Sequence, residues 1–119
     1  MRAKDGVGHY GETVAERHLV EAGYEVLARN WRAPEGELDL VVRKGDALVF
    51  VEVKCRSSID FGEPSEAVGP RKARRIRLLA QRWLAETRPA YAPTIRFDVI
   101  SVLRSERGAA TVTHLEAAF

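Results

Sequence analysis

An apolar run over residues 47–51 leads directly into the charged sequence Glu52-Val53-Lys54. Such a run predicts a buried strand, and burying an unpaired carboxylate or ammonium is costly unless the group is paired or binds a metal. Asp39 precedes Glu52 by thirteen residues, inside a second strand-like run. Two acids and a lysine on one sheet face are what metal-assisted phosphodiester hydrolysis requires.

The register of the two runs decides whether these residues meet. The pair Gly45-Asp46 between them predicts a two-residue hairpin loop with glycine first, which is typical of a type II′ turn. That loop puts Asp39 directly opposite Glu52, with Cβ atoms roughly 4.5–5.5 Å apart on one face. The alternative is a three-residue loop that includes Lys44, which would pair Asp39 with Val51 and put the acids on opposite faces.

Lys54 shares the face of Glu52 because it lies two residues further along the strand, and its cross-strand partner would be Glu37. Two neighbouring carboxylates tend to bind a divalent cation or to share a proton. Carboxylate oxygens with open water positions suit Mg²⁺ or Mn²⁺. The alternative is structural: Glu37 and Lys54 form a salt bridge, and Asp39 is a polar residue at a strand end.

Composition places the chain among globular proteins. Its 119 residues predict one domain over residues 1–119, and 45% hydrophobic with 30% charged residues is typical of a soluble fold. No apolar stretch has membrane-spanning length and no secretory signal is visible, so we expect no membrane partner. The single cysteine, Cys55, excludes an internal disulfide and fits a cytoplasmic location.

Positive charge is concentrated in one segment. Residues 69–90 contain seven Lys or Arg residues against one acid, Glu86, although the net charge of the chain is only +2. This asymmetry favours a basic face for a polyanion. The alternative is a solvated helix face whose arginine stems shield the core.

Periodicity predicts helices over 8–22 and 71–86, three strands over 24–31, 37–43 and 47–54, a fourth strand over 94–103, and a short final strand over 110–117. The apolar stripe expected on the first helix consists of Val14, Ala15, Leu19, Val20 and Ala22. The core stripe expected on the second helix consists of Ile76, Leu79, Ala80, Trp83 and Leu84. Residues 56–70 are expected to form a loop with a helical turn at 65–68. In the fourth strand, Asp98 is expected to pair with an arginine. The element order predicts an α/β sandwich around a mixed sheet.

Several motifs occur together between residue 8 and about residue 102. They are Gly8-x-x-Gly11-Glu12, Gly23-Tyr24, Arg29-Asn30-Trp31, Gly36-Glu37-Leu38-Asp39-Leu40, Phe50-Val51-Glu52-Val53-Lys54-x-Arg56, Phe61-Gly62, Lys72 and Arg96-Phe97-Asp98-Val99. In this order they resemble the PD-(D/E)XK nuclease superfamily. More closely, the chain resembles the YraN-like family of predicted endonucleases, which is related to archaeal Holliday-junction resolvases.

This resemblance implies a restriction endonuclease-like αβββαββ fold and a role for each motif residue. Asp39 and Glu52, with the carbonyl of Val53, would hold Mg²⁺ or Mn²⁺. Lys54 would orient or activate the attacking water. Glu12 would hold the hydration shell of the metal or a second ion. The substrate implied is DNA, with branched DNA in repair or recombination as one class, and resolvase relatives are dimers.

Flanking phosphates would be held by the basic face of the second helix together with the residue after the catalytic strand. The residues expected to bind nucleic acid are Arg56, Arg71, Lys72, Arg75 and Arg82. Two other functions remain open from the sequence. One is a nucleic-acid-binding protein of the same fold that does not cut. The other is an interaction protein in which Glu37–Lys54 is a salt bridge and the arginines supply solubility.

Overall fold

The computed structural model describes residues 6–56 and 68–119. Its elements are α1 (Gly6–Glu21), β1 (Glu25–Ala33), β2 (Gly36–Lys44), β3 (Ala47–Arg56), α2 (Pro70–Thr87), β4 (Thr94–Leu103) and β5 (Thr111–Leu115). This αβββαββ order confirms the expected α/β class and is compatible with a restriction endonuclease-like arrangement. Of the helical turn expected at 65–68, residues 65–67 lie outside the described residues.

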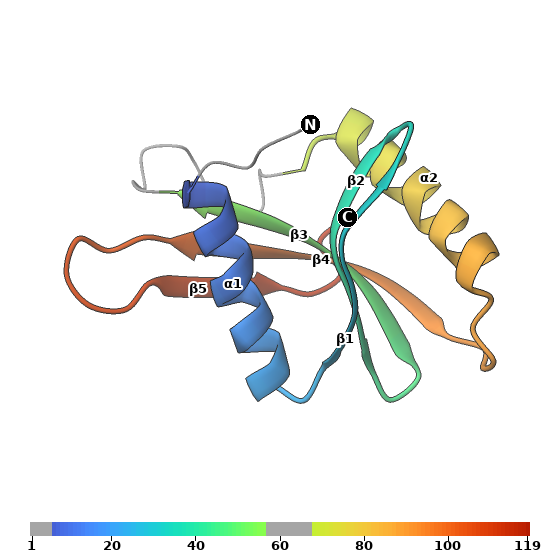
Figure 1. The fold of residues 1–119 in the computed structure, drawn as a ribbon, viewed down its shortest axis with the longest axis horizontal. Coiled ribbons are helices and arrows are strands. Elements are labelled where there is room, and N and C mark those ends of the chain that lie inside the picture. The colour runs from blue at the N-terminus through green and yellow to red at the C-terminus, as the bar shows by residue number, and fades with distance from the viewer. Residues whose placement is uncertain (1–5, 57–67) are drawn as a thin grey trace.

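The five strands form one sheet in the order β1-β2-β3-β4-β5 (Figure 1). β3 and β4 are parallel and the other neighbours are antiparallel, so the sheet is mixed, as the sequence predicts. A parallel pair needs a long crossover connection, and α2 lies within the segment that joins β3 to β4. In Figure 1 the two helices lie on opposite sides of the β1–β2 hairpin.

The β2–β3 hairpin has the two-residue loop. Lys44 pairs with Ala47, and the ladder extends from there to Leu40↔Val51. Gly45 has a φ of 62°, the positive value that a type II′ turn requires at its first loop position. The predicted register is therefore confirmed, and the three-residue alternative is wrong.

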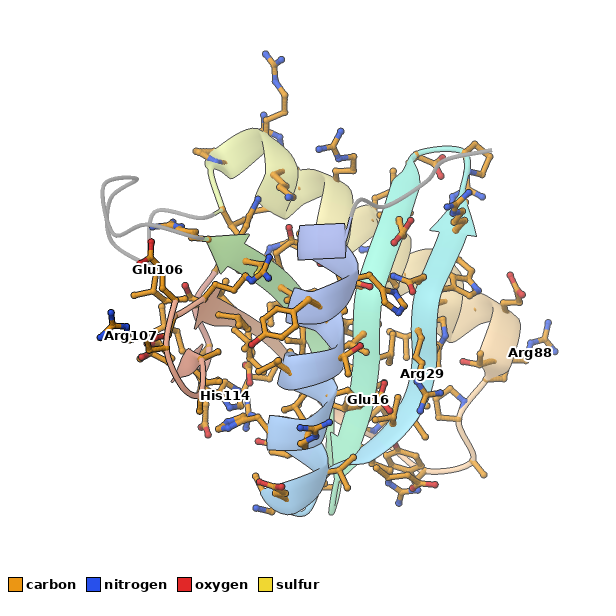
Figure 2. The ribbon with its side chains drawn as sticks, turned by 60° about the vertical axis from the view of Figure 1, so that its left-hand side comes forward. Glu16, Arg29, Arg88, Glu106, Arg107 and His114 are labelled. Carbon is orange, nitrogen blue, oxygen red and sulfur yellow. The ribbon has the colours of Figure 1, made fainter. Side chains whose placement is uncertain are left out.

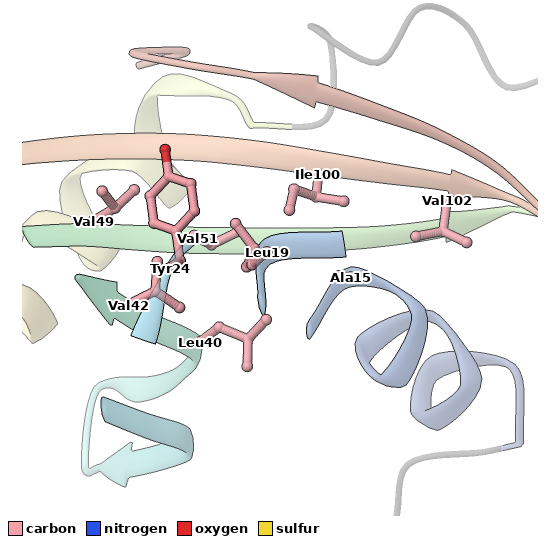
Figure 3. Packing of buried hydrophobic residues seen from close by; sticks show 9 residues of the cluster. All are labelled: Ala15, Leu19, Tyr24, Leu40, Val42, Val49, Val51, Ile100 and Val102. Carbon is pink, nitrogen blue, oxygen red and sulfur yellow. The ribbon is translucent and has the colours of Figure 1, made fainter. Parts of the chain in front are cut away.

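One hydrophobic cluster fills the space between α1 and the sheet (Figure 3). Its buried members are Ala15, Leu19, Tyr24, Leu40, Val42, Val49, Val51, Ile100 and Val102. On α1, from His9 onwards, the buried positions are Gly11, Ala15 and Leu19, spaced four residues apart along one face. Val20 was expected in this apolar stripe but is 53% exposed, because the stripe follows the i, i+4 row and leaves Val20 facing solvent.

Gly11 sets how closely α1 approaches the sheet. A Cβ added at this position would lie 2.5 Å from the Cβ of Cys55 on β3. Only glycine fits at that separation, so the close approach of the helix depends on it. The next residue, Glu12, is thereby held against the end of β3.

We expect Gly11→Ala to destabilise the fold by about 1–3 kcal/mol, because the added methyl group overpacks a tight helix–strand contact. The measurement is the denaturant midpoint of unfolding. Gly69→Ala is the matched control, because a Cβ there meets nothing within 4 Å. Equal midpoints for both variants would show that the α1–β3 contact is not tight.

A second hydrophobic cluster lies between the sheet and α2. Its buried members are Leu38, Val41, Leu48, Phe50, Ile76, Leu79, Ala80 and Trp83. The last four belong to the core stripe predicted on this helix, and its fifth member, Leu84, is partly buried and packs against the cluster, so the stripe is confirmed. Phe50 and Trp83 meet edge to face, with ring centroids 5.9 Å apart. This packing holds α2 against β2 and β3.

Asp98 anchors the C-terminal part of the chain. The side chain is fully buried on β4 and accepts two hydrogen bonds of 2.9 Å from Arg96, which confirms the predicted arginine partner. It also lies 2.8 Å from Nε2 of His114 on β5 and accepts a bond of 3.0 Å from the amide of Ala117. The carboxylate therefore ties β5 and the segment after it to the centre of the sheet.

Candidate metal centre

A cavity of about 480 Å³ opens where α1, α2 and the first three strands meet. All four residues predicted to be catalytic, Glu12, Asp39, Glu52 and Lys54, line it, as does the predicted ligand Val53. The other lining residues are Arg32, Ala33, Gly36, Glu37, Cys55, Lys72, Arg75, Ile76 and Leu79. Residues more than sixty positions apart in the sequence are therefore gathered at one site.

The strands separate at this point. The β2–β3 ladder ends at Leu40↔Val51, one pair before Asp39 and Glu52, so the expected ladder pair between these acids is not formed. Asp39 instead uses its side chain: Oδ2 accepts a 2.9 Å hydrogen bond from the amide of Val53. That bond satisfies a backbone donor where the ladder stops and holds the Asp39 carboxylate between the two strands.

A change of face in β2 redirects its acidic residues. Strict alternation would place Leu38 and Leu40 on one face, yet Leu40 packs with the α1 cluster and Leu38 with the α2 cluster. On β1, Asn30 has a φ of 48°, a left-handed conformation that asparagine tolerates. Asn30 and Asp39 lie between the ladder pairs Arg29↔Leu40 and Trp31↔Leu38 and are not themselves a ladder pair, so the strand pairing is interrupted at this position.

Glu37, Asp39 and Glu12 come together as a result. One ligand oxygen from each lies within 4.8 Å of the others, close enough to share a metal ion. The Asn30 side-chain nitrogen donates 2.9 Å hydrogen bonds to both Glu12 and Glu37, and Arg32 lies 3.3 Å from Glu37. These partly exposed carboxylates form a set of oxygen donors of the kind that Mg²⁺ and Mn²⁺ prefer.

The position of Glu12 is fixed by the next turn of its helix. Glu16 lies four residues further along α1 and binds Arg29 of β1 through bonds of 2.6 and 2.7 Å (Figure 2). The hydrogen bond from Arg29 lowers the pKa of Glu16, so the carboxylate stays ionised and the contact persists. Arg29 and Asn30 are adjacent, so β1 contacts two successive turns of α1.

Glu52 is the buried acid of the site, with 7% of its surface exposed. It forms an ion pair with Lys72 of α2, and Nζ of Lys54 lies 3.7 Å from its Oε2. Burial, together with the charge of Asp39, raises the pKa of Glu52, while both lysines act to lower it. Desolvation thus prevails, and a further positive charge would favour the ionised form.

The two lysines respond differently to their common partner. Burial and the neighbouring Lys72 lower the pKa of Lys54, and the attraction of Glu52 only partly opposes this. Burial is the strongest single effect on Lys72 and acts to lower its pKa, but the hydrogen bond and charge of Glu52, the contact with Lys54 and the charge of Asp39 together outweigh burial and leave this pKa raised. Lys72 is therefore the principal partner of Glu52, and Lys54 is the more readily deprotonated ammonium.

The basic residues expected to bind nucleic acid are not all at the cavity. Lys72 and Arg75 line it, Arg71 is exposed in the first turn of α2, and Arg56 is half-buried at the end of β3. Arg82 lies two turns beyond Arg75 and binds Glu35 at 2.5 Å, in a separate hollow beside Trp31. The structure thus brings Lys72 and Arg75 to the acids and leaves Arg82 engaged elsewhere.

Two features of the site escaped the sequence reasoning. Glu37 was placed opposite Lys54 by strict alternation, whereas it lies in the acidic cluster with Glu12. Asn30, which holds these two acids together, was named only within the motif Arg29-Asn30-Trp31 and was given no role in the site. An asparagine in the middle of a strand is the signal that could have revealed both, because asparagine favours left-handed backbone and disfavours strands.

Comparison with known proteins places the chain in a family. The description of the matching family is "Uncharacterised protein family UPF0102", and the match covers residues 11–102. A UPF0102 protein of Beutenbergia cavernae is 60% identical over 115 residues, which cover 97% of each chain. A relative in Frankia casuarinae is 56% identical over the full length of both chains. A relative in Streptomyces griseus is 48% identical over 96% of both chains.

The chain belongs to the UPF0102 family. The matched region of this UPF0102 protein contains all of the described residues that line the cavity, from Glu12 to Leu79. Among the described residues of the UPF0102 chain, no helix is long and apolar enough to cross a membrane.

Proposed function

We propose that this UPF0102 protein is a metal-dependent endonuclease of the PD-(D/E)XK superfamily that hydrolyses DNA phosphodiesters in the cytoplasm. The observation that carries the proposal is the cavity in which Glu12, Glu37, Asp39 and Glu52 meet Lys54 and Lys72. Carboxylates that cluster in a cavity beside lysines are suited to holding a cation next to an anionic substrate.

The donor set fits Mg²⁺ or Mn²⁺. Asp39 is central, because it belongs to the three-carboxylate cluster and its charge also acts on Glu52. Asp39, Glu52 and the carbonyl of Val53 would hold the ion, with Glu12 and Glu37 holding its water ligands or a second ion. Such an ion supplies polarisation of a phosphoryl oxygen and a lowered pKa for a bound water.

Lys54 is the residue best suited to act on the water. Its Nζ lies beside Glu52. Because its pKa is lowered, a larger fraction of Lys54 is neutral at physiological pH than of an exposed lysine. A lysine in this state can accept or orient a proton of the attacking water and, when charged, offset negative charge in the transition state. Lys54 would therefore position the attacking water and accept or orient its proton.

Arg75, Arg71 and Arg56 would hold the phosphates on either side of the scissile bond. Arg75 is exposed and lines the cavity, and Arg71 lies one turn earlier on α2. Contacts of this kind position a backbone without reading bases, so the preference is expected to be for DNA structure, such as a branch, and not for sequence. Symmetric cutting of a junction would require a homodimer.

A second function is favoured by one observation. The ion pair of Lys72 with Glu52 already neutralises the buried acid. A protein of this fold that binds nucleic acid without cutting could keep such a pair as a permanent structural contact. Cleavage therefore separates the two functions, whereas binding alone does not.

The deciding experiment incubates purified protein with labelled four-way junction, flap, single-stranded and duplex DNA, in the presence of Mg²⁺, Mn²⁺ or EDTA. We expect cleavage of at least one substrate with metal and none with EDTA. Salt-dependent binding to all substrates without cleavage would select the non-catalytic protein. Absence of both binding and cleavage would show that DNA is not the substrate or ligand of this protein.

A further inference from the structure

Lys72 reaches Glu52 from α2, whereas Lys54 and the four carboxylates of the cavity lie on α1, β2 and β3. It is the third residue of α2, and its side chain is 32% exposed, whereas its partner Glu52 is 7% exposed. The ammonium contacts Oε2 of Glu52, the same oxygen that faces Lys54. This oxygen is therefore engaged by two cations from two elements.

The charges that line the cavity are balanced. Four of the described lining residues carry a carboxylate, namely Glu12, Glu37, Asp39 and Glu52. Four carry a cationic group, namely Arg32, Lys54, Lys72 and Arg75. The described part of the lining thus has no net formal charge, so these residues neither strongly attract a phosphodiester nor repel it. Binding of one divalent cation would make the cavity positive.

We propose that Lys72 is a displaceable counter-ion. In the free protein it neutralises Glu52, and when a divalent cation binds, Lys72 moves away from Glu52 and contacts the substrate phosphate. This inference rests on the proposed function and adds a control step to it. A cation and the Lys72 ammonium compete for the same carboxylate oxygen, because both cannot lie at bonding distance from it without strong mutual repulsion.

The surroundings of Lys72 allow the exchange. Its flexible four-carbon stem carries a compact ammonium that can reorient without moving the helix. The first turn of α2 contains no acid that would recapture it. Its helical neighbours Arg71 and Arg75 are exposed and border the same side, where a DNA backbone would lie. A released Lys72 would join these arginines, so metal binding and phosphate binding would be coupled.

Calorimetric titration with Mn²⁺ in the absence of DNA tests the competition directly. We compare the wild-type protein with Lys72→Met, which keeps the stem and removes the charge. If Lys72 occupies Glu52 in about nine-tenths of free molecules, its removal tightens Mn²⁺ binding about tenfold, because apparent affinity falls with the binding-competent fraction. Arg74→Met, an exposed position on the same helix outside the cavity lining, controls for the loss of one positive charge.

The outcomes separate this inference from the proposed function. Tightening in Lys72→Met well beyond that in Arg74→Met supports the exchange. Equal or weaker Mn²⁺ binding by Lys72→Met overturns the exchange while leaving the metal centre intact. Absence of Mn²⁺ binding in every protein, with circular dichroism showing each to be folded, overturns the proposed metal-dependent function itself and the exchange with it.

A second measurement needs no variant protein in the titration. The ¹H–¹⁵N signal of the Lys72 ammonium, assigned by its loss in Lys72→Met, is followed while Mg²⁺ is added to the wild-type protein. We expect this signal to shift or broaden as the ion pair with Glu52 breaks. A Lys72 signal that stays unchanged, while backbone signals of the cavity residues show that Mg²⁺ has bound, would contradict the exchange.

Discussion

Replacement of Asp39 by asparagine is expected to lower the rate of metal-dependent DNA cleavage by about 10³-fold. A bound cation contributes several kcal/mol to transition-state stabilisation, and each 1.36 kcal/mol corresponds to about a tenfold change in rate. Asp39 belongs to the acidic cluster, and its charge also raises the pKa of Glu52. Its loss removes the charge that both parts of the site share.

The fold should survive Asp39→Asn. The side-chain carbonyl of asparagine can still accept the hydrogen bond from the amide of Val53. DNA binding should be retained or tightened, because a negative charge near the phosphate is removed. Rates are measured in single-turnover assays and binding by fluorescence anisotropy on the same labelled DNA.

Asp46→Asn is the control for Asp39→Asn, because it removes the same charge from the exposed loop of the β2–β3 hairpin. We expect its cleavage rate to match the wild type. If Asp39→Asn retained wild-type cleavage, Asp39 would not be a metal ligand. If it lost both cleavage and DNA binding, the residue would have a structural role.

The largest expected effect on stability comes from Asp98. Replacement by alanine should lower the free energy of unfolding by about 3–5 kcal/mol, because it leaves the positive charge of Arg96 without its buried partner. It also removes the acceptor of the bonds from His114 and from the amide of Ala117, which tie β5 to the sheet.

The measurement for Asp98→Ala is the urea midpoint of unfolding at neutral pH. Glu116→Ala is a suitable control, because this exposed acid lies 3.7 Å from the same Arg96 and should contribute little. Comparable small losses in both variants would show that the buried network around Asp98 is not an anchor of the fold.

Asp98 should also make the stability of the protein fall in acid. Burial acts to raise the pKa of Asp98, but the hydrogen bonds from His114, Arg96 and Ala117 outweigh it and leave the pKa below its ordinary value of 3.8. A depressed pKa in the folded state contributes stability that is present above the unfolded value. That contribution is lost as the pH falls from about 4 through the folded pKa.

Urea midpoints measured from pH 7 down to pH 2 test this dependence. We expect the wild type to lose stability below pH 4 more steeply than Asp98→Asn, which has no carboxylate to protonate at this position. Parallel curves for the two proteins would mean that other acids control unfolding in this range.

Local chemistry was sufficient for much of the fold. Gly45 with Asp46 determined the loop and hence the register, because a type II′ turn needs positive φ at its first position. The i, i+3, i+4 spacing of apolar residues identified the buried side of α2, because periodicity there is undisturbed. These features depend on residues close together in sequence, and such signals can be read from one chain.

The remaining details depend on contacts between distant segments. The face change at Asn30 and Asp39 breaks strict alternation, so counting residues put Glu37 opposite Lys54. The contact between Lys72 and Glu52 requires the packing of α2 on the sheet, which no spacing within either element reveals. Val20 was assigned to the core because hydrophobicity alone does not fix which row of a short helix faces inward.

The most direct test of the metal centre is anomalous diffraction at the manganese absorption edge from crystals grown with Mn²⁺. The account predicts a strong anomalous peak in the cavity, at a bonding distance of about 2.0–2.3 Å from an oxygen of Asp39. A cavity without anomalous signal at saturating Mn²⁺, or a peak bound only to residues outside it, would contradict the account.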